Sequence, residues 1–480
     1  MPIDNQIPSS TGVRIAGDHY QWLHVWSACM EALYDDVTAS SSNPIEAVGV
    51  EISGAGNVDD VVRYRQRPPH VYAQVKYAVD NRIAVGLEYL DSEGILRKMV
   101  AAHAKLTADG TPVELRLITN RTNDPQDLMM QQREGRDGRL LPRGGIGGDG
   151  SALGKVRADW ASAARVDVAT LLRFFADFHL DVAYELWSLT NDVGRLMTAN
   201  GLKSDEAAIE RGASWVAAEV RAGHRRMTLG DIRAAVTAMN LQAGSPWTTV
   251  SIATIAHDQL ADQAAVSIDW VDRIAGDKPR LRVAPKHPHT WEELAADLAT
   301  VPGRLGGSRR VLLGGHFRQA TGFFLGAQCQ RVQGFQVAVR QGDQIWGSEE
   351  MTADYPMTIT ENHPNRGGDA ALIVNVSFDA SQDVSHWIER SALPIGTVVI
   401  ATPAAGVGPT SVPNPVAANS LAVSIRDLAR RSQADALHLF LVGPLGVAVL
   451  MGHHWNRVAT TCVYEHLGSD DYARAFTVDV

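Results

Sequence analysis

The second half of the chain alternates between short apolar runs and helical periodicity, and this feature constrains the fold most. Apolar runs typical of buried strands are followed by glycine turns and then by amphipathic segments. The pattern predicts strands at 309–313, 335–340, 371–376, 397–401, 436–442 and 460–465, and helices at 319–328, 383–391, 416–432 and from Pro444 through Met451. Such alternation is typical of a mainly parallel sheet covered by helices.

A weak internal repeat lies within this alternation. The order strand, glycine turn, helix, glycine, strand occurs at 313–335 and again at 441–463. The repeat predicts two similar α/β halves in one domain. In open α/β sheets, ligands bind outside the carboxyl ends of the strands, so we expect a crevice between the halves at that edge.

The first half has a different organisation, and a boundary is expected at the turn-rich segment 242–246. One apolar stripe, with Trp22, Trp26 and Leu33 on it, predicts a helix over 17–35. Residues 157–241 read as helical. Strands are expected at 47–52, 58–64, 71–77 and 113–119. We therefore predict two α/β domains, 1–242 and 247–480.

Composition excludes several function classes for a chain of 480 residues with a net charge of −10. An acidic protein has no general attraction for nucleic acid, so contacts with phosphates must use a local basic patch. The three cysteines lie too far apart in sequence for a zinc knuckle. No apolar run is long enough to span a bilayer, and the first residues lack a secretory signal. We expect a cytoplasmic protein without membrane contact.

The most informative motif for chemistry is an acid on one predicted strand and Q-x-K on the next. The acid is Asp59 or Asp60, and the triplet runs from Gln74 to Lys76. Strand alternation places Gln74 and Lys76 on one face. Phosphodiester hydrolysis needs a hard cation, held by oxygen ligands, and a positive group beside the reacting phosphate. This pattern predicts a PD-(D/E)xK nuclease that uses Mg²⁺ or Mn²⁺, with Lys76 stabilising the transition state.

The assignment of roles follows from parity along the strand. Asp60 is favoured as the metal ligand because Asp59 shares its parity with Arg63. Arg63 belongs to a predicted basic edge, which either binds DNA phosphates or is a solvated strand edge. Gln74 is a weaker ligand than a carboxylate, and Glu51 is expected to supplement the site. Gln21 borders the apolar stripe of the first helix and is a further catalytic candidate, whereas Glu31 lies opposite the stripe and is excluded.

These motifs together resemble the SAVED-domain effector endonucleases of CBASS anti-phage systems, of the CD-NTase-associated protein 4 type. In the first half the resemblance rests on Gly17, Tyr20 and Gln21, on the VDDV run at 58–61 and on QVK at 74–76. In the second half it rests on VLLGGHFR at 311–318, LG at 325–326, HLF at 438–440, GP at 443–444, Ala448, Gly452 and VYE at 463–465.

The resemblance implies a restriction-endonuclease-like domain with a helical extension, of the DUF4297 kind, followed by a SAVED domain of two fused CARF-like, Rossmann-like halves. It also implies a mechanism. A cyclic di- or trinucleotide made after phage infection binds SAVED, the protein self-associates, and the nuclease degrades double-stranded DNA.

The expected ligand residues lie where strands end or helices begin, because an anionic ligand needs backbone N–H groups and a cation. Arg318 supplies the cation, and Trp346 is expected to stack on a base. The remaining candidates are Gly315, His316, Ser377, Thr402, Gly443, Pro444 and Leu445. For the glycines, tight turn geometry is an equal explanation.

Three alternatives remain open from the sequence alone. The chain could be a restriction-type nuclease without nucleotide control, or a catalytically inactive sensor in which Gln74 marks the loss of metal binding. A dinucleotide-dependent Rossmann enzyme is disfavoured, because the GxGxxG at 145–150 has no strand leading into it.

Overall fold

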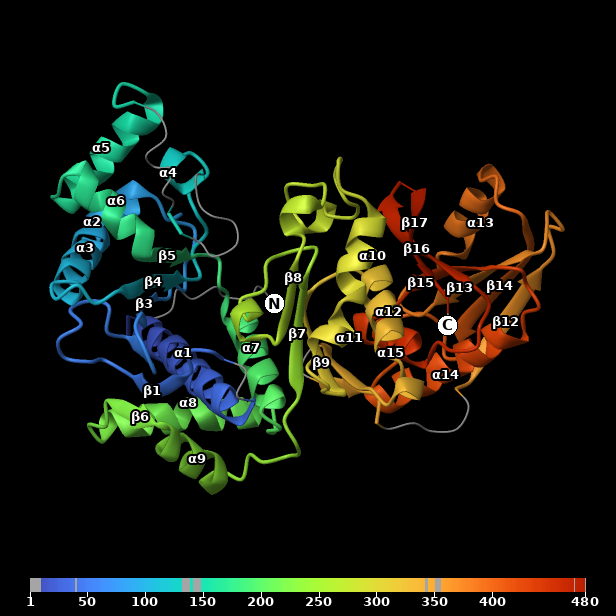
Figure 1. Cartoon of the computed structure of the whole chain (residues 1–480), viewed down its shortest axis with the longest axis horizontal. Coiled ribbons are helices and arrows are strands. Elements are labelled where there is room, and N and C mark those ends of the chain that lie inside the picture. The colour runs from blue at the N-terminus through green and yellow to red at the C-terminus, as the bar shows by residue number, and fades with distance from the viewer. Residues whose placement is uncertain are drawn as a thin grey trace, which may run out of the picture. The chain divides into compact units, whose positions relative to one another are not determined.

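The computed structural model describes residues 10–38, 41–131, 139–140, 148–341, 344–349, 355–469 and 471–479. The chain divides into two compact units, Met1–Pro246 and Trp247–Val480. They are coloured from blue to green and from yellow to red in Figure 1. The division falls at the 242–246 segment where the sequence predicts a boundary.

The N-terminal unit is built around one mixed sheet. Its elements are α1 (Ser10–Thr38), β1 (Ile45–Gly49), β2 (Val61–Arg65), β3 (His70–Lys76), α2 (Leu87–Ser92), α3 (Ile95–Leu106), β4 (Val113–Thr119), α4 (Leu128–Gln131), α5 (Ala152–Ala164), α6 (Val168–Asp177), β5 (Phe178–Asp181), α7 (Leu186–Ala199), α8 (Glu206–Arg221), β6 (Arg226–Thr228) and α9 (Leu229–Ala238). The strand order is β5-β4-β3-β2-β1-β6.

This sheet changes from antiparallel to parallel at β3. Strands β1, β2 and β3 pair antiparallel, whereas β3, β4 and β5 pair parallel. Residues of α2, α3, α5 and α6 form a hydrophobic core with one face of β4 and β5. The predicted strands 47–52, 58–64, 71–77 and 113–119 are confirmed with small changes in their ends. The helical reading of 157–241 missed the short strands β5 and β6.

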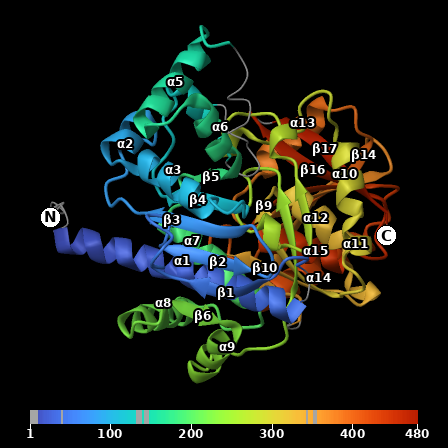
Figure 2. The same cartoon turned by 60° about the vertical axis from the view of Figure 1, so that its left-hand side comes forward.

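Helix α1 is the internal element of this unit. Every residue from 23 to 34 is buried, because α1 contacts β1, β2 and β3 on one side and α7, α8 and α9 on another (Figure 2). Trp26 stacks edge-on against Trp215 of α8 at 5.8 Å between ring centroids. A Cβ at Gly212 of α8 would lie 2.2 Å from the Trp26 ring, so this close approach requires glycine.

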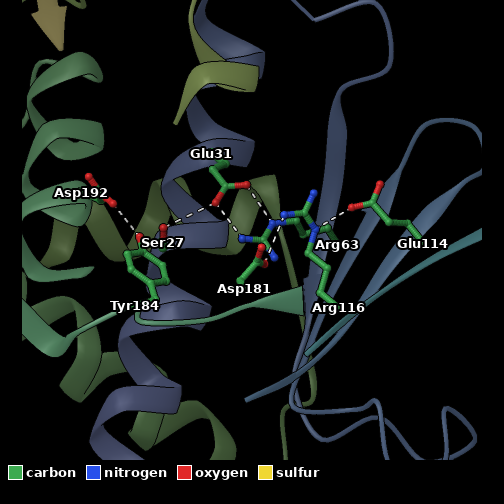
Figure 3. A network of polar contacts seen from close by, with 8 residues as sticks. All are labelled: Ser27, Glu31, Arg63, Glu114, Arg116, Asp181, Tyr184 and Asp192. Carbon is green, nitrogen blue, oxygen red and sulfur yellow. Dashed lines mark hydrogen bonds and ion pairs between the residues drawn. The ribbon is translucent and has the colours of Figure 1, made fainter. Parts of the chain in front are cut away.

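A layer of ion pairs separates α1 from the sheet (Figure 3). Arg63 of β2 donates to both carboxylate oxygens of Glu31 at 2.8 Å. Arg116 of β4 contacts Glu114 at 2.6 Å and Asp181 at 3.4 Å. Two expectations are corrected here. Glu31 is buried rather than exposed, and Arg63 is not part of an exposed basic edge, because its guanidinium is held by Glu31 beneath α1.

The C-terminal unit contains two sheets. Its elements are β7 (Thr248–Ala253), β8 (Val266–Asp269), α10 (Trp291–Ala299), α11 (Val301–Arg304), β9 (Arg310–His316), α12 (Gln319–Gln328), β10 (Gln336–Gln341), β11 (Gln344–Gly347), β12 (Met357–Asn362), β13 (Asp369–Asn375), α13 (Ser381–Arg390), β14 (Ile395–Pro403), α14 (Pro415–Arg431), β15 (Leu437–Val442), α15 (Leu445–His454), β16 (Thr461–Gly468) and β17 (Asp471–Val478). The strand orders are β11-β10-β9-β7-β8 and β12-β14-β13-β15-β16-β17.

The predicted parallel pairing is confirmed in both sheets. Strands β7, β8, β9 and β10 pair parallel, as do β13, β14, β15 and β16, while β11, β12 and β17 add antiparallel edges. The repeat seen in the sequence corresponds to β9–α12–β10 and β15–α15–β16, each a parallel pair joined through a helix. The sequence analysis did not predict β7, β8, α10 or the three edge strands.

Helices α12 and α15 join the two halves of this unit between the sheets (Figure 1). At the point where the two helices come closest, each has a glycine, Gly326 in α12 and Gly452 in α15. A Cβ at Gly452 would lie 1.9 Å from the carbonyl oxygen of Phe323, and one at Gly326 would lie 2.1 Å from that of Val449. One hydrophobic core runs from β7 and β9 through both helices to β13 and β15. The two halves are therefore packed as a single body.

Two further features from the sequence analysis are the GxGxxG run and the expected absence of a membrane-spanning segment. Residues 145–147 of the GxGxxG run lie outside the described residues. No described helix is both long enough and apolar enough to cross a membrane.

Candidate functional site

The acid and the Q-x-K triplet of the N-terminal unit meet at adjacent strands. Val61 of β2 is paired with Ala73 of β3, which sets Asp60 opposite Gln74. The side-chain amide of Gln74 donates to Asp60 Oδ2. The backbone N–H of Val75 donates to the same oxygen at 2.8 Å. Asp60 rather than Asp59 therefore faces the triplet, as the parity argument predicts.

Negative charge is concentrated around Asp60. Burial raises the pKa of Asp60 to about 6, and the carboxylates of Asp59 and Glu51 add to the rise. The Val75 N–H and the Lys76 ammonium act in the opposite direction. Burial and Glu51 also raise the pKa of Asp59. Buried carboxylates with raised pKa values bind a hard cation readily, because the cation supplies the missing countercharge.

A cavity of about 130 Å³ lies beside Gln74, the partner of Asp60. Gln74 and Lys76 both line it, in agreement with their predicted common face. Its other lining residues come from the loop before β2, from helices α2 and α3 and from the turn between these helices, namely Asn57, Tyr89, Glu93, Ile95, Lys98 and Met99. Lys98 and Glu93 were missed by the sequence analysis, because nothing in the local pattern of a helix shows that it packs over the end of β3.

The other predicted residues of this site lie further from the pair. Glu51 is bonded to Arg225 of the segment before β6. Gln21 lies on α1, and its amide nitrogen is buried without a hydrogen-bond partner among the described residues. The preceding residue, Tyr20, contacts Tyr77 at 4.9 Å between ring centroids, so this part of α1 reaches the end of β3.

The donor set at Asp60 fits a Mg²⁺-type site with few protein ligands. Among the described residues, no group of three or more His, Cys, Asp or Glu side chains could hold a metal ion. Mg²⁺ commonly keeps several waters and takes one or two carboxylates from a protein. Asp60 would satisfy that requirement together with the amide oxygen of Gln74 if the Gln74 side chain turned its oxygen, in place of its nitrogen, toward Asp60, whereas a zinc site would need more ligands.

The C-terminal unit holds a larger cavity of about 410 Å³. It opens where β15 and β16 end and where α12, α13 and α15 begin. Its lining combines apolar, aromatic and charged side chains: Ile255, Phe317, Arg318, Gln319, Ala320, Phe323, Phe378, Ala380, Asp383, Leu441, Val442, Leu445, Val463, Tyr464, Glu465, His466 and Tyr472. The position at the carboxyl ends of parallel strands is the one expected for a ligand crevice.

Some predicted ligand residues lie at this crevice. Arg318 and Leu445 line it directly. Arg318 is anchored, because its guanidinium donates to the carbonyl oxygens of Arg282 at 3.0 Å and Arg280 at 3.2 Å. Gly443 lies next to the lining, where it exchanges hydrogen bonds with the side chain of Gln319.

Pro444 and Ser377 are also close to the crevice. Pro444 is the N-cap residue of α15 and directly precedes Leu445. Ser377 directly precedes Phe378, whose side chain is 61% exposed at the crevice.

Other predicted ligand residues do not line the crevice. Trp346 is not available for stacking on a base, because it is 4% exposed and packs against Gly446 of α15. Thr402 lies in β14, paired with Thr358 of the edge strand β12. His316 is exposed and outside the lining.

Gly315 is explained by packing alone. It has a φ of 97°, and a Cβ there would lie 2.1 Å from the carbonyl oxygen of Ile252. The glycine therefore lets β9 pass close to β7, which is the turn-geometry explanation that the sequence left open.

Glu465 also lines the crevice, although the sequence analysis did not name it as a ligand residue. Its carboxylate accepts a hydrogen bond from the backbone N–H of Ala320, in the first turn of α12, at 3.2 Å. The residue is 7% exposed. Burial raises its pKa to about 7, while the Ala320 N–H and Arg318 act in the opposite direction.

Comparisons with known proteins match parts of the chain. The model of the SMODS-associated and fused to various effectors sensor domain, abbreviated SAVED, matches residues 294–478. CD-NTase-associated protein 4 of Enterobacter hormaechei subsp. hoffmannii (strain UCI 50) is 29% identical over 130 residues. That alignment covers 26% of this chain and 26% of the curated relative.

Solved structures described as Cap4 SAVED/CARF-domain containing receptors align over nearly the whole chain. The Cap4 SAVED/CARF-domain containing receptor of Acinetobacter baumannii with the cyclic trinucleotide 3'3'3'-cAAA is 12% identical, with a TM-score of 0.42 over 99% of this chain and 100% of that chain. The Moraxella osloensis receptor is 14% identical, with a TM-score of 0.39 over 97% and 99%. Residues 294–478 therefore match the SAVED sensor-domain family, and the chain is similar over 130 residues to CD-NTase-associated protein 4.

Proposed function

We propose that this protein is an anti-phage effector whose SAVED domain binds a cyclic oligonucleotide and whose N-terminal unit is a metal-dependent endonuclease acting on double-stranded DNA. Ligand binding drives self-association, and self-association activates cleavage. The proposal joins the SAVED match over residues 294–478 to the site at Asp60.

The observation that carries the nuclease half is the pairing of Asp60 with Gln74, with Lys76 on the same strand face. Asp60 and the amide oxygen of Gln74 would hold Mg²⁺ or Mn²⁺. The bound cation supplies polarisation of the phosphate and a more acidic water. Lys76 stabilises the negative charge that develops at the scissile phosphate. Lys98 adds a second ammonium group along the same cavity for the DNA backbone.

The sensor half rests on the composition of the larger crevice. A cyclic oligonucleotide carries phosphates and flat bases. Arg318 and the first backbone N–H groups of α12 provide positive potential at the crevice, and the exposed ring of Phe378 provides a stacking surface. Because the crevice adjoins α12 and α15, which pack both halves into one body, ligand contacts act on the unit as a whole.

We expect DNA cleavage to require Mg²⁺ or Mn²⁺ and to stop in EDTA. The metal requirement should increase below about pH 6, because Asp60 has a raised pKa and takes up a proton as the pH falls through it. The measurement is plasmid cleavage against Mg²⁺ concentration at pH 5.5 and pH 7.5, with a cyclic nucleotide present. Full activity in chelator would reject the metal site. Ligand binding with no cleavage at any Mg²⁺ or Mn²⁺ concentration would favour an inactive sensor.

We expect Arg318→Glu to lose ligand binding and, with it, DNA cleavage. The substitution replaces a phosphate-binding guanidinium with a carboxylate that repels phosphate and lies near Glu465. Arg309→Glu is the matched control, because Arg309 lies outside the crevice and stacks over Phe335. Binding is measured by calorimetry and self-association by light scattering. Wild-type binding and cleavage by Arg318→Glu would place the ligand elsewhere, and full cleavage without any nucleotide would reject gating.

A further inference from the structure

Glu465 belongs to β16, and its buried carboxylate lies against the first turn of α12 inside the ligand crevice. Glu465 Oε2 accepts from the Ala320 N–H at 3.2 Å, and Arg318 precedes the same helix. The N-terminus of a helix attracts anions, because its first N–H groups have no partner within the helix and its dipole is positive there. Glu465 therefore fills the place that suits a phosphate best.

A phosphate and this carboxylate cannot both take that place. Each would need the N–H of Ala320 and the charge of Arg318, and two anions in a desolvated crevice repel each other strongly. We propose that Glu465 is a built-in competitor of the ligand phosphate, which must be protonated or displaced from α12 before a cyclic oligonucleotide can bind. This inference rests on the proposed sensing function and adds a control to it.

The ionisation of Glu465 agrees with such a role. Burial raises the pKa of this carboxyl to about 7. The protonated form is therefore abundant at pH 6 and scarce at pH 8, and an approaching phosphate favours the protonated form further. If only the protonated form accepts ligand, affinity falls as pH rises, by roughly tenfold between pH 6 and pH 8, since apparent affinity scales with the competent fraction.

Other charged and titratable groups face the same crevice and must be separated from Glu465. They are Arg318 before α12, Asp383 of α13, Tyr464 and His466 of β16, and Tyr472 of β17. A substitution at Glu465 alone separates it from these groups, because glutamine keeps the size and the carbonyl acceptor for Ala320 but cannot ionise.

The test compares the wild type, Glu465→Gln and Glu361→Gln by calorimetry at pH 6, 7 and 8. Glu361→Gln is the matched control, because it removes one exposed carboxylate of β12 that does not line the crevice. The probes are 3'3'3'-cAAA, 2'3'3'-cAAA and a set of cyclic dinucleotides. For whichever probe binds, the wild type and Glu361→Gln should weaken about tenfold from pH 6 to pH 8. Glu465→Gln should bind at pH 8 as tightly as the wild type does at pH 6.

Two results would overturn the inference. Glu465→Gln could keep the wild-type pH dependence, or it could fail to bind at every pH, in which case the carboxylate contacts the ligand directly. Melting temperature provides a readout without ligand. Because the pKa of Glu465 is raised in the folded protein, the wild type loses stability as the pH rises above the ordinary pKa of the carboxyl. Glu465→Gln should therefore melt higher than the wild type at pH 8 and at about the same temperature at pH 4.

The melting experiment also distinguishes the two levels of the proposal. If no probe binds the wild type but the melting shift at pH 8 is present, the sensing function is wrong for these ligands. The conclusion that Glu465 ionises in a buried site would still hold. If the shift is absent, Glu465 does not ionise in a buried site, and the inference fails whether or not a probe binds.

Discussion

Lys76→Ala is expected to abolish DNA cleavage while ligand binding stays at the wild-type level. Lys76 lies on the same face of β3 as Gln74, lines the same cavity and acts electrostatically on Asp60. Removing a charge that stabilises the transition state typically lowers the rate by about 100-fold or more. Binding should not change, because the crevice of the SAVED domain contains no part of β3. The measurement is plasmid degradation with Mg²⁺ and an activating cyclic nucleotide.

Lys105→Ala is the control for the loss of one positive charge. Lys105 is exposed in the last turn of α3 and lies outside the cavity. It should cleave DNA like the wild type. A further comparison with Lys98→Ala separates DNA binding from chemistry. The Lys98→Ala substitution should weaken DNA affinity, measured in Ca²⁺, and should have less effect on the maximal rate of cleavage. Near-normal degradation by Lys76→Ala would remove Lys76 from the site.

Arg63→Ala is expected to destabilise the N-terminal unit by about 3–5 kcal/mol, because it leaves the buried carboxylate of Glu31 without its partner. The Glu31 and Arg63 side chains are 5% and 13% exposed, so solvent cannot replace the ion pair. Urea unfolding followed by circular dichroism measures the loss. Arg67→Ala should change stability by less than about 0.5 kcal/mol, because Arg67 is exposed.

The double substitution Glu31→Leu with Arg63→Met tests the cause of that loss. Apolar residues of similar size in place of both partners avoid the cost of an unpaired buried charge and commonly restore stability. We therefore expect the double variant to unfold close to the wild type. If it is as unstable as Arg63→Ala, the arginine stabilises through contacts other than its pairing with Glu31.

The sequence predicted best what depends on local order. The helix at 319–328 has the observed ends of α12, because a strand, two glycines and an apolar helical run are all local signals. The juxtaposition of Asp60 with Gln74 also follows from a local rule, since side chains alternate along a strand. Neither result required knowledge of which helices pack on the sheet.

The failures concern contacts between distant elements. Glu31 was placed on the solvent side because one apolar stripe implies one buried face, whereas Trp26 of that stripe packs against α8 and Glu31 meets Arg63 of β2 on another side of the helix. Trp346 was expected at a ligand, but Gly446 gives its indole a place against α15. Lys98 and Glu465 enter their sites only through tertiary packing, which the spacing of residues along the chain does not record.

The enclosure of α1 has a consequence for synthesis on the ribosome. Its covering helices, α7 to α9, are the last elements of the N-terminal unit to be translated, and β6 closes the edge of β1 at the same stage. A nascent chain that ends before residue 186 leaves Trp26 and its neighbours uncovered, and such exposed apolar surface does not hold a fixed fold. Prematurely terminated products should therefore lack an assembled pairing of Asp60 with Gln74, and under the proposed function such fragments would not cleave the producing cell's own DNA.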